Sequence, residues 1–370
     1  MASMSRRVLA ALSLSLFAPA STPAHGRSSC GPAVSRRGHV IRVVPVDAAR
    51  DTANLQCAFD LASASPGSTV ELAAGTFVSD VVFIDHFVGE VRGEGENETL
   101  VTNVPFMSVN ENWWNSGSPP GPDNVYPQVW TFTEGRFSVR DMKFKASGGP
   151  TSGWVVPGTT IPPIAALVAE VAVTGLDVHA EFSHVTFEAE RSPTDPFYGY
   201  DSYSSVLFTG FPWGPTPALG TGSLLLHHCS FRTTAAGQAL MVASDSHFLV
   251  TNNAYDDVFD VIGITGLQRS TALYSGNRAR NSLYGLTVDF SPTLGFESSL
   301  LIVDGNRFQV SNGLGVLTTF SEGSACVITD NWIDPPSAGI TLGNGTSRCL
   351  VAHNHGATVV DEGTGNHVVP

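Results

Sequence analysis

A short pattern recurs through the second half of the chain at intervals of about two dozen residues. It consists of two or three β-forming residues, a polar pair and then asparagine, as in 249–253 and 273–277. The asparagines are spaced 24, 29, 25 and 23 residues apart, at Asn253, Asn277, Asn306, Asn331 and Asn354. A unit this short cannot bury a hydrophobic face alone and must stack on its neighbours. The repeat therefore predicts a solenoid.

Three segments upstream fit the same frame without the asparagine. They are 225–229, 181–185 and 138–142, and the intervals from the first repeat backwards are 24, 44 and 43 residues. The longer intervals leave two alternatives open, either one coil with a long insertion or two coils apiece.

Stacked coils place equivalent residues in columns, about 4.8 Å apart from one coil to the next. The positions three and five residues before the asparagine are apolar in nearly every repeat, for example Phe248 and Val250, and we predict that they face the interior. The position between them faces outward and is also apolar, with Leu225, Leu249, Leu273, Ile302, Val327 and Leu350. We call these six residues the leucine stripe. An apolar stripe of this length is expected to be covered by a loop, a tail or a second copy of the chain.

The asparagine column is expected to be structural. A side-chain amide at a turn is able to bond both the turn backbone and the amide of the next coil. We therefore predict a ladder of hydrogen bonds rather than a ligand site.

Composition agrees with an all-β chain. Glycine (37) and proline (23) are abundant without a collagen period, which is typical of a turn-rich protein. A solenoid needs a cap at its end, and Leu55, Phe59 and Ala62 recur at helical spacing after Asp51, which is the expected N-cap. We predict a linker over 21–39 and one solenoid domain over 40–370, with loop insertions near 106–130 and 190–222.

Three segments of the N-terminal part carry a resemblance to a known superfamily. Residues 55–59, 66–77 and 91–95, followed by the asparagine-bearing coils, resemble right-handed parallel β-helix proteins of the pectin-lyase-like superfamily. The resemblance implies that fold and a polysaccharide as partner. It does not imply a reaction, because the superfamily includes lyases, hydrolases, epimerases, tailspikes and surface proteins without known catalysis.

The N-terminus reads as an export signal. Arg6 and Arg7 precede the apolar run 8–18, and Ala18 and Ala20 offer the small residues of a cleavage site. The run is too short for a membrane span. We therefore predict a signal peptide over 1–20, a secreted or periplasmic protein and no membrane insertion. The net charge of −14 argues against a nucleic-acid partner.

The five cysteines cannot all pair, and none shows a zinc-site spacing. Cys326 and Cys349 occupy equivalent places in the repeat, and Cys30 is within reach of Cys57. For each pair a disulfide and two buried thiols remain open alternatives.

Two groups of residues are candidates for the site. The first is aromatic and falls in the expected loops, where binding residues concentrate. The candidate substrate-binding residues of this group are Trp113, Trp114, Tyr198, Tyr200 and Trp213. Flat rings offer sugars an apolar face, but the same rings are equally able to pack on one another as a satellite cluster.

The second group is ionic. Arg232, Asp256 and Arg280 stand three residues past the ladder position on successive coils. A polysaccharide lyase needs a base and cations that hold a uronate carboxylate, so we single out Asp256, Asp257, Arg280 and His227 as catalytic candidates, with Arg278 as a substrate-binding one. The alternative is a surface ion-pair ladder.

The signatures of the superfamily's enzymes are mostly absent. Of the polygalacturonase set only the paired Asp256 and Asp257 is present, and no calcium-binding repeat is found. A divalent cation such as calcium would suit an acidic protein acting on an acidic glycan, but the sequence names no ligands for it. The leading hypothesis is an exported β-helix protein that binds a polysaccharide and cleaves it as a lyase or hydrolase. The alternative is a non-catalytic binding or adhesin protein, with oligomers formed through the leucine stripe.

Overall fold

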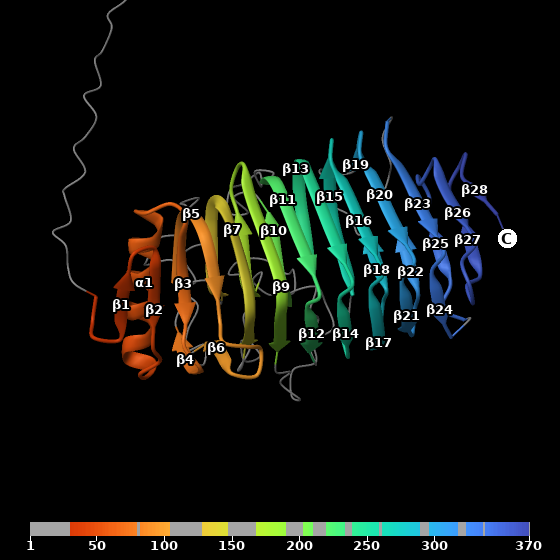
Figure 1. The fold of residues 1–370 in the computed structure, drawn as a ribbon. Helices are drawn as coiled ribbons and strands as arrows, with labels where there is room; N and C mark the ends of the chain where they lie inside the picture. The colour runs from red at the N-terminus through yellow and green to blue at the C-terminus, as the bar shows by residue number, and fades with distance from the viewer. Residues whose placement is uncertain are drawn as a thin grey trace, which may run out of the picture.

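The computed structural model shows a right-handed parallel β-helix, in which successive coils follow one another from a helical cap to the C-terminal end (Figure 1). The structure describes residues 30–79, 82–103, 128–146, 168–189, 203–209, 220–233, 239–258, 261–288, 296–316, 323–335 and 337–369. The described strands form three stacks of parallel strands. The longer strands bend at a corner of the coil and belong to two stacks.

The first stack holds the repeat found in the sequence. Its strands pair in the order β2 (Val40–Val43), β3 (Ser68–Leu72), β5 (Val82–Arg92), β7 (Gln128–Ala146), β9 (Val178–Ala189), β11 (Gly220–His227), β13 (Ala239–Thr251), β16 (Thr271–Ser275), β20 (Leu300–Asp304), β23 (Ala325–Thr329), β26 (Cys349–Ala352) and β28 (His367–Val368).

The second stack follows the turn at the asparagine column. Its strands pair in the order β4 (Gly75–Ser79), β6 (Thr99–Asn103), β7, β9, β12 (Ser230–Thr233), β14 (Ala254–Asp256), β17 (Arg278–Ser282), β21 (Arg307–Val310) and β24 (Trp332–Asp334).

The third stack completes each coil. Its strands pair in the order β5, β7, β8 (Val168–Thr174), β10 (Tyr203–Thr209), β13, β15 (Ile262–Gln268), β18 (Leu286–Val288), β22 (Leu314–Val316), β25 (Ile340–Leu342) and β27 (Val359–Asp361), and the short β19 (Phe296–Glu297) also pairs with β15.

The stacking register confirms the coil prediction. Val250 is the direct partner of Tyr274, and Tyr274 is the partner of Val303. All three side chains are fully buried, as the inner columns require. Upstream, β7 pairs directly with β9 and β9 with β11, so the intervals of 44 and 43 residues are single coils that carry insertions.

The asparagine column forms the predicted ladder. The Oδ1 atom of Asn277 accepts hydrogen bonds from the backbone nitrogen and from Nδ2 of Asn253, at 3.0 and 3.1 Å. Asn306, Asn331 and Asn354 repeat this arrangement coil by coil. Each described Nδ2 also donates to a backbone carbonyl, as Asn253 does to Leu226. The ladder thus satisfies the polar groups that a buried turn would otherwise leave unpaired.

The residue before each ladder position explains the polar pair of the repeat. His228, Asn252, Gly276, Gly305, Asp330 and His353 all have positive φ, between 55° and 66°. Glycine adopts this left-handed conformation freely, and asparagine, aspartate and histidine tolerate it better than other residues. The turn therefore selects these residue types.

The cap is the helix α1 (Ala48–Ser63), which buries Leu55, Phe59 and Ala62 as predicted. The expected N-cap was wrong. Asp47 is the N-cap and accepts a hydrogen bond from the backbone of Arg50, whereas Asp51 lies in the first turn and is fully buried. The Asp51 carboxylate accepts from the backbone nitrogens of Val46 and Val78, at 2.8 and 3.0 Å. It thus joins the helix to the first coil.

Two further contacts hold the capped end. The strand β1 (Val34–Arg37), within the segment assigned to a linker, pairs antiparallel with β2. The disulfide between Cys30 and Cys57 ties this segment to α1. A second disulfide joins Cys326 to Cys349 on neighbouring coils, and Cys229 is a buried free thiol whose pKa is raised to about 12 by burial.

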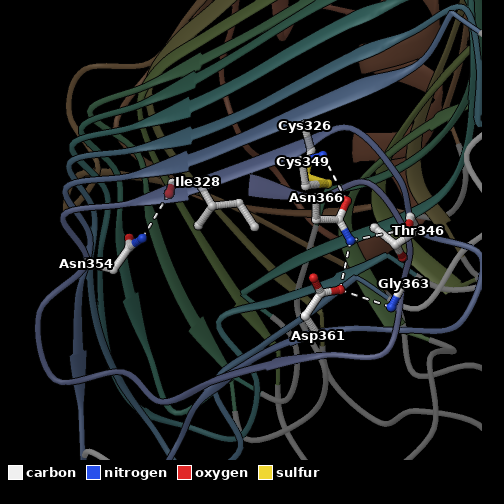
Figure 2. The surroundings of a disulfide bond; sticks show 8 residues. All are labelled: Cys326, Ile328, Thr346, Cys349, Asn354, Asp361, Gly363 and Asn366. Carbon is white, nitrogen blue, oxygen red and sulfur yellow. Dashed lines mark hydrogen bonds between the residues drawn. A yellow bond between two sulfur atoms is a disulfide. The ribbon is translucent and has the colours of Figure 1, made fainter. Parts of the chain in front are cut away.

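The C-terminal coil is held by a polar network beside the second disulfide (Figure 2). The Oδ1 atom of Asn366 accepts from the backbone of Cys349 at 3.0 Å, and its Nδ2 donates to Asp361 at 2.8 Å. Asp361 also accepts from the backbone of Gly363.

The leucine stripe faces outward from the first stack, in register from β11 to β26. Leu249 and Leu350 remain 39% and 36% exposed, and the other four members are half-buried. That a loop, a tail or a second copy covers the stripe stays a prediction.

Candidate functional site

The outward side of the second stack carries two parallel columns of side chains. One residue past the ladder position stand Ser230, Ala254, Arg278, Arg307 and Trp332. Two residues further along each strand stand Arg232, Asp256, Arg280, Gln309 and Asp334, although the register between β17 and β21 shifts after Ala279, so Arg280 and Gln309 are not direct partners. The period of two in a strand places both columns on the same face, pointing away from the core.

The residues between these columns point inward and build a rigid floor. Phe187, Phe231 and Tyr255 stack ring on ring, with centroids 5.1 and 4.6 Å apart. All three are buried, and burial raises the pKa of the Tyr255 hydroxyl well above its ordinary value. The floor therefore positions the outward side chains without offering Tyr255 itself to a ligand.

A shallow groove of about 370 Å³ lies over this floor. Its lining comes from four successive coils, on β12, β14, β17 and β21. The charged and polar residues that line it are Ser230, Arg232, Asp256, Arg278, Arg280, Arg307 and Gln309. We call this the basic groove.

Asp256 and Arg280 form an ion pair inside the basic groove. Arg280 Nη2 lies 2.6 Å from Asp256 Oδ2, and Asn281 Nδ2 donates to the other carboxylate oxygen at 3.0 Å. The bond from Arg280 is the main cause that lowers the pKa of Asp256, and Asn281 and the charge of Arg232 lower it further. The same bond raises the pKa of Arg280. Asp256 is therefore a carboxylate held in its ionised form, with one hydrogen bond to each oxygen.

Among the described residues, the other three arginines of the groove form no ion pair within 4.0 Å, although the charge of Arg232 acts on Asp256. Arg232 is in register with Asp256 and Arg278 with Arg307, and all three arginines are exposed. Four arginines and one aspartate give the groove lining a net charge of +3, whereas the whole sequence carries −14. The cations are thus concentrated on one face of an acidic protein.

The basic face extends beyond the groove toward the capped end. Lys143 and Lys145 lie on the same outward side, in register with Thr186 and Glu188. Both ammonium groups share the Glu188 carboxylate, at 3.4 and 3.5 Å. They are the two lysines of the whole sequence.

Sequence reasoning missed Arg307 and Trp332. Trp332 follows Arg307 in the same column, with Arg307 Cζ 5.8 Å from the centre of its ring, and its own exposure is 52%. The signal was present, because the column that holds Arg278 continues to both residues on the next two coils.

The structure brings Arg232, Asp256, Arg278 and Arg280 together, but it does not bring His227 to them. His227 lies at the end of β11 in the first stack, where its Nε2 is 3.1 Å from Glu181 and its Nδ1 is 3.0 Å from His228. Asp257 is an exposed turn residue with φ of 56° and is outside the groove lining.

The candidate substrate-binding residues of the loops, Trp113, Trp114, Tyr198, Tyr200 and Trp213, lie outside the described residues. So does the expected signal peptide, residues 1–20. Within the described ranges, no three histidine, cysteine or acidic side chains are arranged to hold a metal ion. No helix in the same ranges has the length and apolar character that crossing a membrane requires.

Comparisons with known proteins assign this chain to no family. No protein-family model matches the chain, and no curated protein matches it. Among solved structures, the A-module of the mannuronan C-5 epimerase AlgE6 from Azotobacter vinelandii is 11% identical, with a TM-score of 0.32, 86% of this chain covered and 94% of that one.

Two further solved structures are similar at the same level. The catalytic unit of the GH87 α-1,3-glucanase from Streptomyces thermodiastaticus is 10% identical, with a TM-score of 0.43, and covers 92% of this chain and 70% of its own. The pectin methylesterase PemA from Erwinia chrysanthemi is 10% identical, with a TM-score of 0.35, and covers 81% and 90%. The strand pairing of this structure is itself that of the parallel β-helix that the resemblance in the sequence implied.

Proposed function

We propose that this protein binds an acidic polysaccharide in the basic groove. The observation that carries the proposal is the net charge of +3 on the groove lining, set against −14 for the chain. The net charge of the whole protein is negative and repels anions, so it would not draw an anionic ligand to the surface. A ligand of this face must therefore be anionic and must be recognised locally.

The geometry of the arginines suits a polymer. Neighbouring coils lie about 4.8 Å apart, and the groove offers a guanidinium on three of its four levels, β12, β17 and β21, with Asp256 of β14 between the first two. A guanidinium binds carboxylate or sulfate groups with two parallel hydrogen bonds. One such contact at an exposed surface is weak. A polysaccharide with repeated acidic groups makes several such contacts at once, and their covalent linkage raises the overall affinity.

A second function, cleavage by a lyase mechanism, is favoured by the same arginines. Guanidinium groups beside a uronate carboxylate stabilise the charge that develops when a base removes the adjacent proton. The described lining supplies the cations but not the base, since Asp256 is its single carboxylate and its pKa is lowered by Arg280. A lyase would therefore take its base from elsewhere in the chain. Hydrolysis by paired carboxylates is less suited to this lining.

The binding proposal is tested by calorimetry with the full chain. A hexamer of galacturonic acid and a neutral cellohexaose serve as probes, at low salt and at about 0.15 M salt. We expect the acidic hexamer to bind, with an affinity that falls as salt rises, and the neutral hexamer to bind at least about tenfold more weakly. Equal affinity for both hexamers would contradict the proposal.

The cleavage function has its own assay. The full chain is incubated with acidic and neutral glycans, with and without calcium, and new reducing ends and unsaturated sugars are measured. Unsaturated products would establish the lyase, new reducing ends alone would indicate a hydrolase, and neither product would leave binding as the function.

We also propose that the protein is exported after cleavage behind Ala20, as the sequence of residues 1–20 suggests. N-terminal sequencing of the protein recovered from the medium or the periplasm tests this. The expected first residue is Ser21, and an intact N-terminus would contradict export by this signal.

A further inference from the structure

An exposed aromatic ring continues the basic groove toward the C-terminal end of the solenoid. Trp332 lies on β24, one coil beyond Arg307 in the same outward column, and His355 is its partner on the following coil. About half of Trp332 is exposed, at 52%, although Ile333 beside it fills the core at 1% exposure. The ring is therefore not needed to complete the interior.

The ring is held in place by its neighbours. The guanidinium carbon of Arg307 lies 5.8 Å from its centre, within the range of a cation–π contact, and the ring of His355 lies 5.8 Å from it on the other side of the column. A side chain held in this way loses less conformational freedom when a ligand binds.

Polar residues stand in the neighbouring column on the coils of Arg307 and Trp332. Gln309 and Asp334 are register partners in the neighbouring outward column, and both are exposed. Gln309 also lines the groove. An aromatic ring, a cation, an amide and a carboxylate thus stand on the outward side of two adjacent coils.

We propose that Trp332 is a stacking platform that makes the basic groove select acidic sugars over other polyanions. The proposal rests on the function proposed above and deepens it. The C–H face of a pyranose ring packs on the exposed part of the indole, which removes apolar surface from water. Arg307 then binds the acidic substituent of that ring, while Gln309 and Asp334 bond its hydroxyls. A flexible polyanion without rings uses the arginines alone.

The experiment compares two probes on three forms of the full chain. The probes are a galacturonic acid hexamer and a poly-glutamate of similar charge, and the forms are wild type, Trp332→Ala and Trp332→Phe. Binding is measured by calorimetry, and tryptophan emission is recorded during the same titrations. Leu249→Ala, an exposed apolar residue on another face, is the matched control.

We expect Trp332→Ala to weaken binding of the hexamer about tenfold and to change binding of poly-glutamate less than twofold. Trp332→Phe should restore most of the affinity for the hexamer but abolish the emission change that the hexamer causes in the wild type. Leu249→Ala should change neither. Circular dichroism and the unfolding midpoint verify that each variant is folded.

Two results would overturn the platform, and they are distinguishable from failure of the binding function. If the wild type binds the hexamer and Trp332→Ala binds it equally well, the platform is wrong and the groove remains. If Trp332→Ala weakens both probes equally, the ring supports the arginines and does not recognise sugar. If the wild type binds no acidic hexamer, both proposals fall.

Discussion

The asparagine ladder and the basic groove lie on the same coils, one to three residues apart, and they use repetition in opposite ways. Each rung of the ladder repeats one residue, and each amide is buried and bonded to the next. The columns of the groove change residue from coil to coil, and three of its arginines form no close ion pair with another described residue. Identical, satisfied positions stabilise the fold, whereas varied, unsatisfied ones are available to a ligand.

The largest effect is expected from breaking a rung of the ladder. Asn306→Ala removes the acceptor of two bonds from Asn277 and the donor to the Tyr274 carbonyl. Because the orphaned groups are buried, we expect a loss of about 3–5 kcal/mol in the free energy of unfolding, measured by urea denaturation. Asn312→Ala, at an exposed asparagine, is the control and should stay within about 0.5 kcal/mol of wild type. An unchanged midpoint for Asn306→Ala would show that the ladder is not structural.

The disulfide of the inner column comes next. Replacing Cys326 and Cys349 with alanine opens a link between coils separated by 23 residues. We expect a loss of about 2–4 kcal/mol in the same assay, with binding of the acidic hexamer unchanged because the bond lies away from the groove. Loss of binding in a folded variant would contradict the separation of fold and site. Mass mapping of the wild type under non-reducing conditions verifies that the bond is present.

Removing cations from the groove should weaken ligand binding and leave the stability of the fold nearly unchanged, the reverse of what is expected for the disulfide. We expect Arg278→Ala with Arg307→Ala to weaken binding of the acidic hexamer about 100-fold, since each lost charge-assisted contact costs about tenfold. The free energy of unfolding should change by less than about 0.5 kcal/mol, because both side chains are exposed. Arg37→Ala, an exposed arginine on β1, is the control. If the control Arg37→Ala weakens binding as much as the double variant Arg278→Ala with Arg307→Ala does, the net charge of the protein and not the groove attracts the ligand.

The smallest effects concern Asp256. Asp256→Asn raises the charge of the groove lining from +3 to +4, and we expect about threefold tighter binding of the acidic hexamer. Arg280 lowers the folded-state pKa of Asp256, so the stabilisation by this pair is present above the ordinary carboxylate pKa and is lost as the pH falls through the lowered value. The wild type should therefore exceed the variant by less than about 1 kcal/mol at about pH 7 and equal it at about pH 2. If the variant instead loses a measured cleavage activity, Asp256 is a catalytic residue.

The ladder and the groove also differ in how far the sequence predicts them. The ladder, the inner columns and the alignment of Arg232, Asp256 and Arg280 follow from spacing alone, because a solenoid converts sequence intervals into contacts. The sequence does not distinguish the N-cap, because Asp47 and Asp51 both suit that position. The backbone nitrogens of Val46 and Val78, which bind Asp51 inside the fold, decide between them.

The groove itself was less predictable. Its depth depends on the floor of stacked rings and on the reach of the arginines, and neither is encoded in a local pattern. His227 is close to the groove residues in sequence, but the turn at the ladder directs it to the adjacent face, where it lies beside Glu181. Trp332 stands one residue past Asn331, so its column follows from the repeat, but its exposure and its contact with the Arg307 guanidinium are known only from the structure.

The most direct test is a crystal structure of the full chain with an acidic hexasaccharide. We expect the sugar to lie over β14, β17, β21 and β24, with acidic groups within hydrogen-bond distance of Arg278 and Arg307. A hexasaccharide bound instead on the leucine stripe or on the outer face of the third stack, with the basic groove empty, would contradict the account.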